Sequence, residues 1–117
     1  MGDDESKDRW DSIKTRLRDT NGEVVEGGID VRFGGACPVQ GYGTIDGRAC
    51  YYRSRSGDMR LDIFPTAITP EAAWDILPDP EWSHGEDSTA EHYGWEDAAT
   101  SAAFIKRAAA AWRKERP

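Results

Sequence analysis

The chain lacks any long apolar run. No stretch of its 117 residues approaches the ~20 consecutive apolar residues that a membrane-crossing helix needs. The N-terminal segment MGDDESKDRW is acidic and does not show the basic-then-apolar order of a secretory signal. We therefore expect a cytoplasmic protein without membrane attachment. Its length predicts one domain over residues 1–117, with a flexible acidic N-terminus at residues 1–5.

Residues that could build a catalytic or metal site are scarce. The two histidines, His84 and His92, would need a turn to meet at one metal, and the zincin helix motif is absent. No serine lies in a nucleophile-elbow context. The glycine-rich GYGTIDG at residues 41–47 fits the spacing of neither the dinucleotide fingerprint nor the P-loop. We therefore expect a protein that is not an enzyme and that binds no metal or cofactor.

Basic residues are missing from the long segment 61–105, which holds ten acids and no Lys or Arg. Segments 1–31, 32–60 and 106–117 carry net charges of -4, +3 and +4, and the whole chain carries -7. Most of such a surface would repel a phosphate backbone, so we do not expect direct nucleic-acid binding. The acidic segment is either a solvated surface or a mimic of nucleic-acid charge that engages a basic protein.

Apolar spacing predicts three helices. Trp10, Ile13 and Leu17 form a narrow stripe on a helix over residues 6–19. Thr69 and Pro70 are typical of the start of a short helix that reaches about Leu77. The longest helical signal follows Ser88 and has an apolar seam made of Trp95, Ala98, Ala102, Ile105, Ala109 and Trp112. This seam could pack inside its own domain or form the contact of a homodimer.

Alternating apolar residues predict a strand over residues 27–33, and two turn signals predict two successive hairpins after it. A two-residue turn at Asp46-Gly47 would pair Tyr42 with Tyr51. A second turn at Ser56-Gly57 would pair Arg53 with Arg60. The first register also places Cys37 opposite Ser56, far from Cys50, so we expect no disulfide.

These elements predict an α+β fold. We expect an antiparallel sheet of about four strands in a meander, with an N-terminal helix and two C-terminal helices packed on one face. The segment 78–88, rich in Pro, Gly, Ser and acids, is expected to be a long loop.

Strand alternation separates a core face from a water-facing side. The core face gathers Ile45, Cys50, Tyr52, Met59, Leu61 and Ile63. The opposite face carries the candidate binding surface, which consists of Tyr42, Tyr51, Arg53, Arg60 and Asp62. Arg53 opposite Arg60 destabilises a sheet unless an anion relieves the repulsion, whether Asp62, a ligand or an acidic partner. Tyr and Arg are also frequent at interface hot spots.

The stretch PVQGYGTIDGRACYYRSRSGDMRL, residues 38–61, resembles small uncharacterised proteins found in actinobacteria and their phages that share a P-V-x-G-x-G-x-I-D-G-x-x-x-Y-Y-R-x-R-x-G hairpin. This resemblance implies no activity. The absence of a catalytic set and the divided charge lead us to expect a small binding protein, encoded by a phage, that acts on a host protein. An alternative is a sequestering protein for an anionic nucleotide-like ligand, with the arginines on phosphate and a tyrosine on the base. The charge mimic described above is a second alternative.

Overall fold

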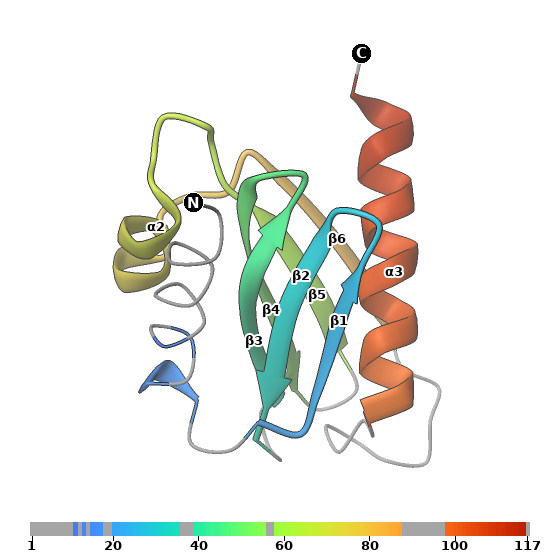
Figure 1. Ribbon diagram of the computed structural model, residues 1–117. Coiled ribbons are helices and arrows are strands. Elements are labelled where there is room, and N and C mark those ends of the chain that lie inside the picture. Colours follow the sequence, from blue (N-terminus) through green and yellow to red (C-terminus); the bar gives the residue numbers. More distant parts are fainter. Residues whose placement is uncertain are drawn as a thin grey trace.

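The computed structural model describes residues 11, 13, 15–17, 20–35, 39–55, 58–87 and 98–116. Six strands form one antiparallel sheet in which the spatial order follows the chain order. The strands are β1 (Gly22–Glu26), β2 (Ile29–Gly34), β3 (Val39–Ile45), β4 (Arg48–Arg55), β5 (Asp58–Ile63) and β6 (Trp82–Asp87). Two helices, α2 (Pro70–Ile76) and α3 (Ala98–Glu115), flank the sheet on opposite sides (Figure 1).

The predicted α+β class and the antiparallel meander are confirmed, but the sheet has more strands than the four expected. The expected strand at 27–33 is β2, and β1 pairs with its outer side. The expected loop at 78–88 is wrong in part, because residues 82–87 form β6 along the other edge, whereas residues 78–81 belong to no helix or strand and Ser88 lies outside the described residues. Pairing with β5 supplies the hydrogen bonds that make this polar segment a strand.

The expected arrangement of three helices on one face is also wrong. Helix α2 lies on the opposite side of the sheet from α3 (Figure 1). It also comes between β5 and β6 in the chain, so α3 is the one helix of the described ranges that follows the sheet. The expected N-terminal helix at 6–19 is not among the defined elements. Residues 11, 13, 15 and 16 have helical backbone, and the rest of that span, like residues 1–5, lies outside the described residues.

The predicted registers of both hairpins are confirmed. Tyr42 pairs with Tyr51 across β3 and β4, and Arg53 pairs with Arg60 across β4 and β5. Cys50 is a free, buried thiol, and Cys37 lies outside the described residues, so the absence of a disulfide stays a prediction. Burial raises the pKa of the Cys50 thiol, so it is not a reactive thiolate.

The main core lies between the sheet and α3. All the residues expected on the core face are buried there, together with Phe104, Ile105 and Trp112 of the helix. The Tyr52 and Ser101 hydroxyl groups meet inside this core at 2.9 Å. The described part of the predicted seam therefore packs against the sheet of its own chain, because Ile105, Ala109 and Trp112 are buried there and Ala102 is partly buried. Ala98 is exposed, and Trp95, like the predicted start of this helix after Ser88, lies outside the described residues. A homodimer, which stays a prediction, would need another surface.

Ion pairs join the C-terminal end of α3 to the turn between β3 and β4. Arg113 donates hydrogen bonds to both carboxylate oxygens of Asp46, at 2.7 and 2.9 Å, and Arg116 donates a third at 2.6 Å. These guanidinium groups lower the pKa of Asp46 below that of an ordinary aspartate. The turn and the helix end thus hold each other in place.

A second, smaller core lies on the opposite face under α2. Thr69 caps this helix by accepting a hydrogen bond from the Ala72 backbone N–H, and Pro70 occupies its first turn, as predicted. The buried Trp74 of α2 donates its indole N–H to the Cys50 carbonyl oxygen at 3.1 Å. Helix α2 contacts β3 and β4.

Candidate functional site

The two predicted tyrosines do not face water. Tyr42 and Tyr51 each expose only 8 % of their surface, and their rings lie 5.3 Å apart between centroids. The prediction of a water-facing tyrosine pair is therefore wrong, because Trp74 covers Tyr42 edge-on with 6.3 Å between ring centroids. Burial and the neighbouring Tyr51 raise the pKa of the Tyr42 hydroxyl. These tyrosines belong to the second core, and only a small part of each is exposed.

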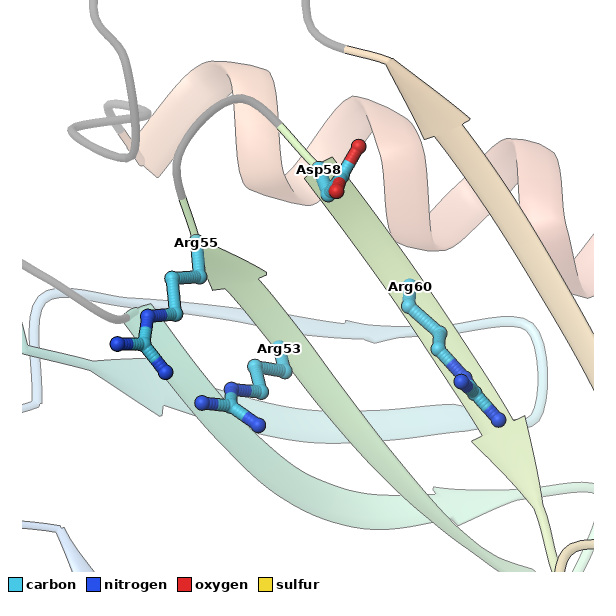
Figure 2. Close-up of a pocket in the computed structure, with 4 residues that line it drawn as sticks. All are labelled: Arg53, Arg55, Asp58 and Arg60. Carbon is cyan, nitrogen blue, oxygen red and sulfur yellow. The ribbon is translucent and has the colours of Figure 1, made fainter.

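The predicted arginines, Arg53 and Arg60, are exposed, in contrast to the tyrosines. They lie on the same face of the sheet as Tyr42 and Tyr51. Strand alternation places Arg53 and Arg55 of β4 on the side of Tyr51, and Arg60 of β5 lies directly opposite Arg53. Together with Asp58 they line an open groove with a volume of about 320 Å³, which we call the arginine groove (Figure 2). The structure thus assigns Arg55, which sequence reasoning missed, to the same surface.

The three arginines differ in their partners. Arg60 donates its Nε to the Asp62 carboxylate at 2.7 Å, and Ser83 donates its hydroxyl to the same oxygen at 2.6 Å. Asp62 is therefore the neighbouring acid that relieves the charge of Arg60. Within the described parts of the chain, no carboxylate lies within ion-pair distance of Arg53 or Arg55. Figure 2 shows these two side chains projecting from β4 in the same direction, whereas Arg60 runs along β5.

Asp58 is the acid among the described residues that line the arginine groove, and it interacts with a second aspartate. Asp58 is the cross-strand partner of both Arg55 and Asp87. A hydrogen bond to the Asp87 carboxyl, together with the charge of that group, raises the pKa of Asp58. Asp58 therefore takes up a proton more readily than an isolated aspartate does, and a carboxyl that holds a proton offsets less of the arginine charge.

A second groove borders the first one. It has a volume of about 270 Å³ and lies between the sheet and the segment that follows α2. Its lining consists of Tyr51, Arg53, Arg60, Asp62, Phe64, Leu77, Pro78, Asp79 and Pro80. We call it the proline groove. Arg53 and Arg60 line both grooves, so the two form one continuous surface.

The histidines do not form a metal site in the described structure. His84 lies in β6 between the rings of Trp82 and Phe104, and its Nε2 lies 3.0 Å from the Glu86 carboxylate. His92 lies outside the described residues. Across the described ranges, no group of three or more His, Cys, Asp or Glu side chains is arranged to hold a metal ion.

Part of the acidic segment 61–105 is neutralised by arginines. Asp62 pairs with Arg60, and three further acids pair with arginines from other parts of the chain. These pairs are Asp75 with Arg16, Glu81 with Arg48, and Glu86 with Arg107. Much of this acidity therefore serves to hold the elements together rather than to form an uninterrupted anionic face.

No helix in the described part of the chain is both long enough and apolar enough to cross a membrane. Comparison of the chain with protein-family models, with curated proteins and with solved structures gave no significant match. The site is therefore interpreted from its own geometry.

Proposed function

We propose that this protein is a small non-enzymatic binding protein whose arginine groove binds a carboxylate-bearing segment of a partner protein. The observation that carries the proposal is the pair Arg53 and Arg55, exposed side by side and without an ion-pair partner among the described residues, in a chain of net charge -7. If the chain is encoded by a phage, as the hairpin resemblance implies, the partner would be a host protein.

The chemistry of the groove suits a carboxylate. Guanidinium groups form paired, charge-assisted hydrogen bonds with carboxylates, which adds directional specificity to the attraction. Arg53 faces Arg60 across the strands, and Asp62 relieves the charge of Arg60 alone. A bound anion would remove the remaining repulsion, so its binding is favoured both by new contacts and by the loss of an unfavourable one.

The nucleotide alternative has less support. It requires a tyrosine on which a base can stack, and both candidates expose only 8 % of their surface. Tyr51 contributes to the lining of the proline groove, but none of the described residues that line the arginine groove is aromatic. A nucleotide would therefore be held in the arginine groove through its phosphates, and it serves as a competitor in the test below. The charge-mimic alternative has less support too, since four acids of segment 61–105 are already paired with arginines.

The test is direct binding of a fluorescein-labelled, glutamate-rich peptide, measured by fluorescence anisotropy at low salt. We compare the double variant Arg53→Gln/Arg55→Gln with the charge-matched double variant Lys106→Gln/Lys114→Gln, which removes the same charge from α3. The first variant should raise the Kd by about tenfold, since two exposed charge pairs contribute about 1 kcal/mol each at most. The second should change it by less than about twofold.

Equal losses in both double variants would show that only the net charge matters, and the proposal would then fail. An excess of ATP that displaces the peptide at a far lower concentration than glutamate-rich competitor would instead favour the nucleotide alternative. Circular dichroism of each variant establishes that the fold is retained.

A further inference from the structure

The proline groove adds an apolar element beside the arginines. Its outer wall is the segment that leaves α2, and its inner wall includes Arg53 and Arg60, which it shares with the arginine groove. A segment that lies across this boundary would meet guanidinium groups on one side and Leu77 and Pro78 on the other.

Exposed apolar side chains are concentrated at this place. Ile76 exposes 69 % of its surface and Leu77 exposes 41 %. Within the described ranges, Val25 on β1 is the only other large hydrophobic residue that is exposed to a similar degree. Adjacent exposed apolar residues beside a groove are typical of a binding surface, whereas an isolated one is not.

Leu77 has a backbone conformation that is unfavourable for leucine. Leu77 closes α2 in the left-handed conformation, with φ 43° and ψ 63°, and its N–H donates to the Ala73 carbonyl. Glycine and asparagine adopt this conformation with less strain and would close the helix in the same way. A leucine here is strained and exposed at once, so the stability of the fold does not account for it. Strain of this kind is concentrated at functional sites.

We infer that the partner segment carries a large apolar side chain next to its carboxylates, and that this side chain binds against Leu77 in the proline groove while the carboxylates bind the arginines. This inference rests on the proposed function and specifies its partner further. The partner is an acidic segment with one apolar anchor, because the basic and apolar parts of the surface are continuous through Arg53 and Arg60.

The test uses two peptides that differ at one position, Glu-Glu-Leu-Glu-Glu and Glu-Glu-Ser-Glu-Glu. Each is titrated into the ¹⁵N-labelled full chain, because amide chemical shifts also report weak binding. The leucine peptide should bind the natural chain about fivefold more tightly than the serine peptide, as expected for a partly buried leucine. In the Leu77→Asn variant, whose residue suits the left-handed conformation, this difference should disappear.

The arginine variant separates this inference from the proposed function. Arg53→Gln/Arg55→Gln should weaken both peptides while keeping their ratio. If that variant weakens both peptides but the two bind the natural chain equally, the proposed function stands and the apolar anchor is overturned. If neither peptide shifts any amide of the two grooves, both ideas are overturned.

A second copy of this chain is the competing occupant of the proline groove. Sedimentation velocity of the natural chain and of Leu77→Asn distinguishes the two. A dimer that dissociates in the variant would assign Leu77 to self-association and overturn the inference. A monomer in both cases, together with the loss of the leucine preference, would support it.

Discussion

At the scale of single residues, Asp58 gives the arginine groove a predictable response to pH. Its pKa is raised by the hydrogen bond to Asp87, so it takes up a proton at a higher pH than an ordinary aspartate as the pH falls. Protonation removes a negative charge beside Arg55 and Arg60. A peptide of cysteic acid, whose sulfonates stay charged, should therefore bind more tightly at about pH 4.5 than at pH 7.

Asp58→Asn is the control for this response. Asparagine is neutral at every pH, so the variant should bind the sulfonate peptide more tightly than the natural chain at neutral pH and should show a weaker dependence on pH. An unchanged pH profile in the variant would assign the response to other groups.

Several individual contacts could be predicted from the sequence because turn chemistry determines them. A two-residue Asp46-Gly47 turn leaves a single register for β3 and β4, and the Arg53–Arg60 pair follows from the next hairpin. The burial of Tyr42 could not be predicted in this way, because it depends on Trp74, which is distant in the sequence. Arg55 was missed, although strand alternation in the predicted register already places it on the same face as Arg53.

At the scale of elements, α2 determines which part of its sheet face is buried. Trp74→Ala should lower the free energy of unfolding by about 4 kcal/mol, because the ring is 2 % exposed and its N–H bonds to the Cys50 carbonyl. Ile76→Ala, in the same helix but 69 % exposed, should change it by less than about 0.5 kcal/mol. Urea denaturation of both variants measures the contrast. Similar values for the two would mean that α2 does not cover the tyrosines.

The two edge strands show the limit of reading elements from the sequence. β1 (GEVVE) has one buried residue, Val24, and β6 (WSHGED) has none that is fully buried. An edge strand is held mainly by backbone hydrogen bonds to its neighbour, so little apolar alternation is required of it. The central strands and α3 carry apolar periods and were predicted, although Phe104 and Ala108 were missed beside the expected seam.

At the scale of the whole molecule, segments of opposite charge are neutralised against each other. The basic end of the chain pairs with acids from three places, through Lys106 with Glu26, Arg107 with Glu86, and Arg113 with Asp46. The basic segment 32–60 is neutralised less completely, and its unpaired arginines remain at the groove. The sequence showed which segments were charged, but only the fold shows which charged side chains have no ion-pair partner among the described residues.

Removing most of α3 tests whether its seam belongs to the core. A chain that ends after Ala103 lacks Phe104, Ile105 and Trp112, all buried against the sheet. We expect it to lose cooperative thermal unfolding and the dispersion of its amide signals, since one face of the sheet would be exposed to water. A folded monomer with dispersed signals would contradict this expectation and would indicate that the seam is a dimer contact.

The order of α3 after the six strands has a consequence for synthesis. Because the strands pair in the order in which they are made, the sheet can assemble strand by strand as the chain leaves the ribosome. Its apolar face, however, stays uncovered until the 18 residues of α3 are released. Translation that stalls before this point would leave the apolar face of the sheet exposed, and chaperones would bind it. Chains that include α3 should therefore aggregate far less than nascent chains that lack it.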